Sequence, residues 1–194
     1  MPRGRGKTKA GVAQEPYNIE THPYNKLIIP QLRVVKWQID FLRDNMPAPE
    51  LLEKPIHGWT HLLHMLVYAS LFCNYSAFHL EVVKWAILTH DCGRYHDDLQ
   101  ESLHPSMSAH LARIMIAKGV NVDADKVSSI VARHSQTNDA YCNEEAVLRA
   151  SDRLDLWRLP NFKGIDEKLV TAPGWRKVEV MAKHLRLQGR MPDE

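Results

Sequence analysis

The 194-residue sequence has few cysteines and no long apolar run. Its three cysteines (Cys73, Cys92 and Cys142) are odd in number and have no paired spacing, which favours reduced thiols in a reducing compartment. A membrane-spanning helix needs roughly 20 apolar residues, and no run approaches that length. The N-terminus also lacks the apolar region of a secretory signal, so we expect a cytoplasmic protein with no membrane partner.

Acidic residues are absent from the first 14 positions, where Arg3, Arg5, Lys7 and Lys9 lie. Four of the 25 basic residues are there, which leaves 21 against 23 acidic residues in the rest of the chain. We expect residues 1–14 to be a disordered basic tail and residues 15–194 to form one folded domain. The sequence leaves open whether the tail makes weak contacts with nucleic acid and whether the chain forms homo-oligomers.

No stretch shows the alternation of apolar and polar residues, bounded by hairpin turns, that is typical of β-strands. The apolar residues recur instead at helical spacing. We therefore predict an all-α bundle of about seven helices. Their expected ranges are about 31–45, a second helix that carries His57 to Tyr68, 78–90, 105–118, 123–134, 144–157 and 175–187. Asp123 is placed to cap the fifth helix, and Pro105 suits the first turn of the fourth.

The third helix delivers an adjacent imidazole and carboxylate, His90 and Asp91, to its C-terminal end. Such a pair can bind one cation if other side chains converge on it. His61 opens an apolar helix upstream, and Asp152 lies on an apolar helix downstream. A buried charge at Asp152 is unfavourable unless it is paired or metal-bound, so it is either a metal ligand or a salt-bridge partner of Arg149 or Arg153.

The order of His61, His90-Asp91 and Asp152 resembles the ligand set of the HD superfamily of metal-dependent phosphohydrolases, over about residues 55–160. The resemblance implies one or two divalent ions, such as Mn, Mg, Co, Ni, Fe or Zn. In relatives with additional histidines, the Asp of the pair bridges two metals. Here His104 and His134 match these histidines, and they would hold either a second metal or the substrate phosphate.

Other polar residues near the motif are candidates for supporting roles. Arg94 can bind a phosphate with two hydrogen bonds, and Asp97 or Asp98 can orient or deprotonate the attacking water. Asp91 and Arg94 with Asp97 form the expected catalytic set. His57 and His64 lie four residues before and three after His61, and we expect them to orient its imidazole or to be packing residues. We expect Cys92 to be a packed residue and not a nucleophile.

The resemblance implies hydrolysis of a nucleotide or another small phosphate ester, with a water activated by the metal attacking phosphorus. Two alternatives are open at this stage. One is a nuclease or phosphodiesterase acting on nucleic acid or cyclic nucleotides, which the basic tail favours and the near-neutral remainder opposes. The other is a non-catalytic module that binds metal or nucleotide, which an intact ligand set disfavours.

Overall fold

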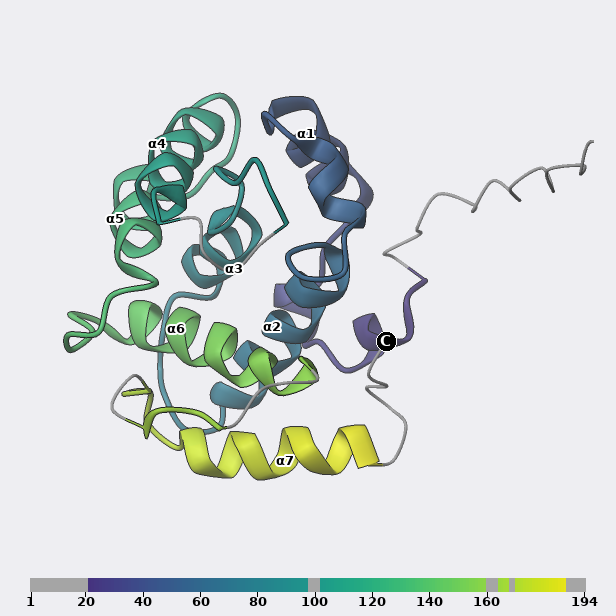
Figure 1. Cartoon of the computed structure of the whole chain (residues 1–194), viewed down its shortest axis with the longest axis vertical. Helices are drawn as coiled ribbons and strands as arrows, with labels where there is room; N and C mark the ends of the chain where they lie inside the picture. The colour runs from purple at the N-terminus through teal and green to yellow at the C-terminus, as the bar shows by residue number, and fades with distance from the viewer. Residues whose placement is uncertain (1–20, 98–101, 160–163, 168–169, 188–194) are drawn as a thin grey trace, which may run out of the picture.

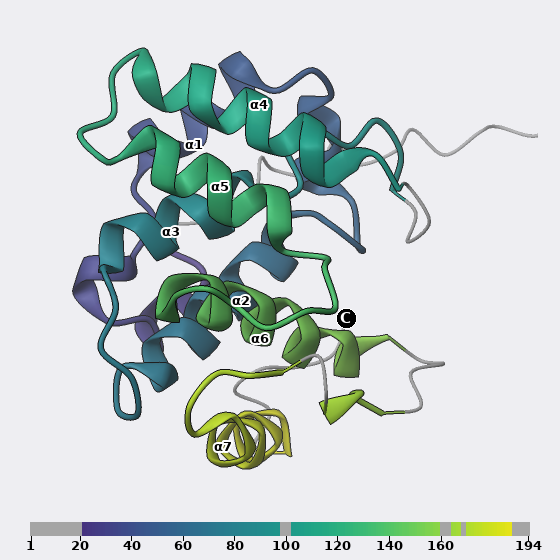
Figure 2. The same cartoon turned by 90° about the vertical axis from the view of Figure 1, so that its left-hand side faces the viewer.

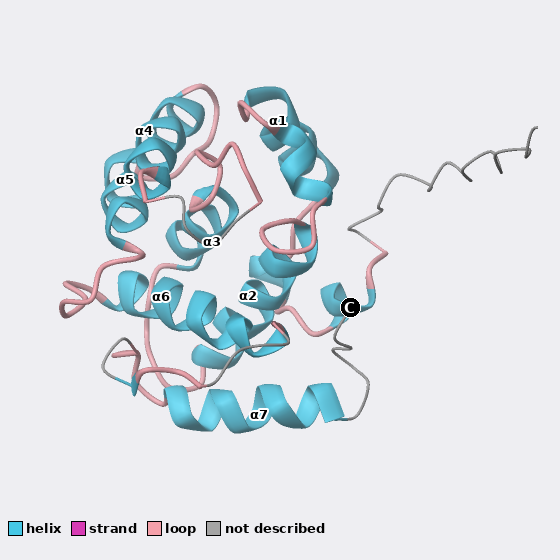
Figure 3. Cartoon of the chain, viewed as in Figure 1, coloured by secondary structure: helices cyan, strands magenta, loops and turns pink. Residues whose placement is uncertain are grey.

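The computed structural model describes residues 21–97, 102–159, 164–167 and 170–187 (Figure 1). These ranges contain seven α-helices and no strand (Figure 3), which confirms the predicted all-α fold. None of their helices is both long and apolar enough to cross a membrane. The expected tail, residues 1–14, lies outside the described residues, and so does Asp98.

The helices are connected mainly by short loops and 3₁₀ turns. Their bounds are α1 Lys36–Asn45, α2 Trp59–Phe72, α3 Leu80–Thr89, α4 His104–Ala117, α5 Ala124–Arg133, α6 Asn143–Asp155 and α7 Trp175–Leu187. Asp123 caps α5 as predicted, since its side chain accepts a hydrogen bond from the backbone N–H of Lys126. Proline occupies the first turn of α4, where its missing N–H would have no helical partner.

Helix α2 lies at the centre of the fold. All but one of its 14 residues are buried, because its sequence is apolar on every side. It packs against α3, α6 and α7, while α4 and α5 pair with each other on the far side of α3 (Figures 1 and 2). Polar side chains on a helix with this environment must therefore find partners inside the protein.

Helices α1 and α2 are among those that begin later than the sequence predicts. Helix α1 begins at Lys36 and not at Gln31, because Pro30–Leu32 forms a 3₁₀ turn followed by extended backbone at Arg33. The apolar spacing suggested an α-helix here because Leu32 and Val34 are buried in the core, although the segment that carries them is not α-helical. Helix α2 begins at Trp59, so His57 precedes the helix.

Gly58 explains where α2 begins. A Cβ at Gly58 would lie 2.2 Å from the carbonyl oxygen of Lys54 and 2.6 Å from that of Leu52. Only glycine allows the chain to pass that close to the preceding turn. The close approach fixes the entry of α2 and places His57 and His61 on either side of the helix start.

Candidate metal centre

Six predicted ligands come together from five helices. His61 is in the first turn of α2, His90 and His134 directly follow α3 and α5, and His104 is the first residue of α4. Asp91 follows His90, and Asp152 lies in the last turn of α6. All are buried except Asp152, whose side chain is 15% exposed. The site is therefore made from helix ends that meet in the interior.

His61, His90 and Asp152 form the first cluster of potential metal ligands. The Nε2 atoms of His61 and His90 lie 3.2 Å apart, and Oδ1 of Asp152 lies 3.6 Å from His61 Nε2. One ligand atom from each residue falls within 4.8 Å of the others, a spacing that suits a shared ion.

Asp91, His104 and His134 form the second cluster. The Nε2 atoms of His104 and His134 lie 3.0 Å apart, and Oδ1 of Asp91 is 3.3 Å from His104 Nε2. Its other oxygen, Oδ2, lies 3.2 Å from Nε2 of His90 in the first cluster. Asp91 therefore faces both clusters, one oxygen to each.

The hydrogen bonds of the ring nitrogens test whether a cation fits. Nδ1 of His90 donates to the carbonyl oxygen of Ile87 at 2.8 Å, and Nδ1 of His134 donates to that of Val131 at 2.7 Å. Since a carbonyl only accepts, a neutral ring must then carry its lone pair on Nε2. His61 is fixed in the same way by a carboxylate on Nδ1. The lone pairs of His61 and His90 then point at each other, an arrangement that a metal ion stabilises.

The electrostatic environment also favours positive charge between these groups. Burial alone would lower the pKa of His90, but Asp91 and Asp152 outweigh it and raise that pKa. Burial likewise would raise the pKa of Asp91, yet His90 and Arg94 hold it well below its usual value. Burial lowers the pKa of His134 to about 3, which keeps that imidazole neutral, as a ligand must be.

Gly93 positions the second cluster. A Cβ there would lie 2.4 Å from the backbone nitrogen of Ser108, so the loop after Asp91 can pack directly on α4 only with glycine. The N–H of Gly93 donates to Ser108 Oγ at 2.9 Å. This contact joins the loop to the helix that begins with His104.

Asp155, to which sequence reasoning gave no role, holds the first cluster from behind. Its carboxylate is fully buried and accepts from Nδ1 of His61 and from Nδ1 of His64, both at 2.6 Å. Nε of Arg158 donates to it as well, at 2.5 Å. His64 thus shares the Asp155 carboxylate with His61. Helical spacing was the signal, because His61 and His64, like Asp152 and Asp155, are three residues apart.

His57 and Asp97 lie beside the clusters in a different arrangement from the one expected. Asp97 accepts from Nδ1 of His57 at 3.0 Å and from its backbone N–H at 3.1 Å. Asp97 is not among the cavity-lining residues, whereas His57 is, with Nε2 3.9 Å from Oδ2 of Asp91. Burial is the main reason that the pKa of His57 is lowered to about 4.

A cavity of about 310 Å³ opens onto both clusters. Its charged lining comprises the carboxylates of Asp91 and Asp152 and the guanidinium groups of Arg94, Arg153 and Arg158. Nε of Arg94 donates to Oδ1 of Asp91 at 2.7 Å, at the second cluster. Asp152 pairs with Arg153, while the other salt-bridge candidate, Arg149, pairs with Glu145.

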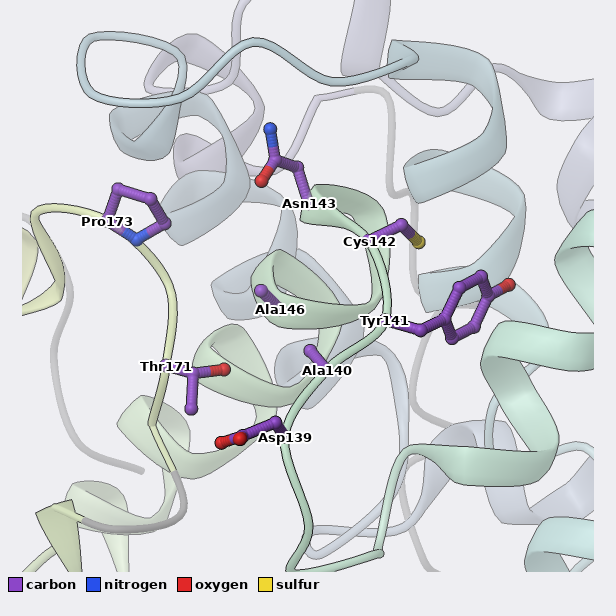
Figure 4. Close-up of a pocket in the computed structure, with 8 residues that line it drawn as sticks. All are labelled: Asp139, Ala140, Tyr141, Cys142, Asn143, Ala146, Thr171 and Pro173. Carbon is purple, nitrogen blue, oxygen red and sulfur yellow. The ribbon is translucent and has the colours of Figure 1, made fainter.

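A second cavity, of about 330 Å³, lies between the loop before α6 and residues 171–173 (Figure 4). Asp139 and Thr171 face each other across it, while the ring of Tyr141 points away from them. Its lining contains one carboxylate, Asp139, and no histidine. The chemistry described above therefore belongs to the first cavity.

Cys92, within the His90–Arg94 motif, is buried at 2% exposure. Burial raises the pKa of its thiol to about 12, which keeps the sulfur protonated. Because the thiolate is the reactive form, Cys92 is a packing residue, in agreement with the expectation from sequence.

Comparison with known proteins identifies the family. The HD domain family model matches residues 58–157, which is half of the chain and includes every residue of both clusters. No curated protein and no solved structure matched the chain. The match spans the motifs on which the sequence resemblance rested and ends shortly after Asp155. The chain therefore belongs to the HD domain family, within the superfamily of metal-dependent phosphohydrolases.

Proposed function

We propose that this protein is a phosphohydrolase that uses two divalent cations to hydrolyse a small phosphate ester, of which a nucleotide is the favoured example. The observation that carries the proposal is the pair of three-residue clusters joined by Asp91. Each cluster mixes imidazole and carboxylate ligands, which suits hard or borderline divalent ions.

The two clusters suggest which residues would bind each cation. His61, His90 and Asp152 would hold one cation, and His104 and His134 would hold the other, with Asp91 shared. When bound, the cations would supply Lewis-acid polarisation of the phosphoryl group and a lower pKa for water. The protein contributes fixed tautomers, because Nδ1 of His61, His90 and His134 is already committed to a hydrogen bond.

Arg94 and His57 are the proposed functional side chains beside the metals. Arg94 reaches both Asp91 and His104, so its guanidinium lies where it can neutralise charge on a transferring phosphoryl group. His57 presents Nε2 to the cavity, with Asp97 fixing the ring from behind. We assign the acceptance of a proton from the attacking water to His57, with Asp97 acting through it.

The dimensions of the cavity favour a small substrate. A volume of about 310 Å³ lies at the lower end of the range for small-molecule sites. The cavity lining also includes Ile56 and Leu156, which provide apolar surface beside the charged groups. This combination suits a phosphate attached to a compact organic group and favours a nucleotide over a nucleic-acid strand.

The test combines metal content with turnover. Elemental analysis of the purified protein should be followed by phosphate-release assays on nucleotides and oligonucleotides with Mn²⁺, Mg²⁺, Co²⁺ and Ni²⁺. We expect His90→Ala and Asp91→Ala to lose bound metal and turnover together, and a chelator to abolish activity. His110→Ala, an exposed histidine of α4, is the matched control. Full activity of Asp91→Ala would refute the assignment, and cleavage of oligonucleotides alone would favour a nuclease.

A further inference from the structure

Arg153 contacts Asp152, which is a member of the first cluster. Its Nη1 pairs with Oδ2 of Asp152, whose other oxygen lies 3.6 Å from Nε2 of His61. The Arg153 side chain is 17% exposed and lines the cavity, so it is reachable from the substrate side. Neither the family match nor the ligand set explains an arginine at this position.

A fixed positive charge beside a cation site is unfavourable for the cation. Asp152 would be shared between the metal and the guanidinium, and the two positive groups repel each other across it. Arg158, the other arginine of the α6 end, is different. It is held by Asp155 and by the carbonyl oxygens of Pro55 and Ile56, which gives it a structural role. Among the described residues, the hydrogen-bond partner of the Arg153 side chain is Asp152 alone, and its position in the cavity lining is explained if an anion enters the cavity.

Arg94 and Arg153, two of the three described arginines that line the cavity, contact different clusters. Arg94 contacts Asp91 and His104 of the second cluster, whereas Arg153 contacts Asp152 of the first. A transferring phosphoryl group has three equatorial oxygens, and two cations with Arg94 can contact all three. Arg153 would then be available to bind a neighbouring anionic group on the same substrate.

We propose that Arg153 binds a second phosphate group adjacent to the scissile one, so that the site prefers substrates with two linked phosphates over simple monoesters. The inference rests on the proposed function, because it locates the scissile phosphate between the two clusters. A guanidinium suits this role because it forms charge-assisted, paired hydrogen bonds to phosphate oxygens.

The first test measures Mn²⁺ binding by titration in the absence of any phosphate. If Arg153 opposes the cation, Arg153→Gln should lower the Kd for Mn²⁺ by about three- to tenfold. If Arg153 merely orients Asp152, the same substitution should raise that Kd. Arg176→Gln, which removes an exposed arginine paired with Glu167, is the control and should change nothing. An unchanged or raised Kd for Arg153→Gln overturns the proposal.

The second test compares two probes that need no turnover, methylenebisphosphonate and methylphosphonate, on the Mn²⁺-loaded protein. Arg153→Gln should weaken the bisphosphonate by about tenfold or more, and by clearly more than it weakens the monophosphonate. If Arg153→Gln weakens the binding of both probes equally, or of neither, the proposal is overturned, even if the Kd for Mn²⁺ changes as expected. Because both readouts are binding constants, they can succeed or fail separately from the phosphate-release assay that tests the proposed function.

Discussion

Asp155 and His61 are joined by a 2.6 Å hydrogen bond between two buried side chains, a carboxylate from the last turn of α6 and an imidazole from the first turn of α2. The bond fixes which nitrogen of His61 faces the cation site. The same carboxylate also accepts from His64 and Arg158. One residue therefore orients a candidate metal ligand, His61, and anchors Arg158 in the wall of the cavity.

Replacement of Asp155 by asparagine should weaken metal binding without removing a ligand. An amide has one acceptor oxygen, and its NH₂ group would face a donor nitrogen of His61, His64 or Arg158. We expect the Kd for Mn²⁺ to rise by about 10- to 100-fold, measured by titration on protein shown to be folded by circular dichroism. Asp125→Asn, at an exposed salt bridge with Arg113, is the control. Wild-type affinity in Asp155→Asn would show that orientation of His61 does not depend on this bond.

The sequence predicted the all-α fold, and it singled out the candidate ligands that the structure brings together, because both follow from local patterns. Helical spacing located seven helices, and the adjacent His90 and Asp91 fixed a centre to which distant residues could be assigned. The role of Asp155 could not be obtained in this way, because its two histidine partners lie on α2 and the pairing depends on how α2 packs against α6. Asp152 and Asp155 lie one turn apart and are equivalent in sequence. Only packing shows that Asp152 joins the first cluster while Asp155 supports its histidine.

The loop after Asp91 shows a second feature that could not be predicted from the sequence, the direction of its side chains. Spacing placed Asp97 near the site but did not determine its direction, and in the structure it turns towards His57. His57 itself was expected on the second helix, yet it precedes the helix because Gly58 allows a close turn. The directions of loop side chains depend on tertiary contacts such as these, which no periodicity encodes.

Substitution of Gly93 by alanine should destabilise the fold and disturb the second cluster. The new Cβ would lie 2.4 Å from the Ser108 backbone nitrogen, and backbone cannot move aside as a flexible side chain can. We expect a loss of about 1–3 kcal/mol in the free energy of unfolding, with weaker binding of the second cation. Gly119→Ala is the matched control, since nothing lies within 4 Å of its added Cβ. Urea unfolding and Mn²⁺ stoichiometry measure the two effects, and equal stability of the two variants would contradict the steric argument.

The thiol of Cys92 should be unreactive in the folded protein. It is 2% exposed and burial raises its pKa to about 12, whereas Cys73 is exposed. In a thiol titration at pH 8, Cys73 should react in the native state and Cys92 only after denaturation. Cys92→Ala should keep turnover per folded molecule and lose about 1 kcal/mol of stability from the small cavity. Rapid native labelling of Cys92 with loss of turnover would instead assign it a chemical role.

Glu144 should stabilise the protein at neutral pH through an ionised carboxylate. Its Oε1 atom accepts from the His79 backbone N–H, before α3, and from Nζ of Lys126 on α5, both at 3.0 Å. Burial alone would raise the pKa of Glu144, but these two hydrogen bonds outweigh it and hold the pKa at about 2. Since the folded pKa lies below the ordinary value of 4.5, the stabilisation is complete above pH 4.5 and is lost as the pH falls towards 2.

Replacing Glu144 with glutamine should therefore lower the free energy of unfolding by about 1–3 kcal/mol at pH 7, and the difference from the wild type should shrink below pH 4.5. Urea unfolding between pH 7 and pH 3 measures this difference in the free energy of unfolding. Glu167→Gln, which removes an exposed salt bridge with Arg176, should change stability by less than about 1 kcal/mol at any pH. Since Glu144 joins α6 to α3 and α5 outside the metal clusters, turnover per folded molecule should be retained. A stability difference that persists unchanged to pH 3 would mean that packing, and not the charge of Glu144, holds these helices together.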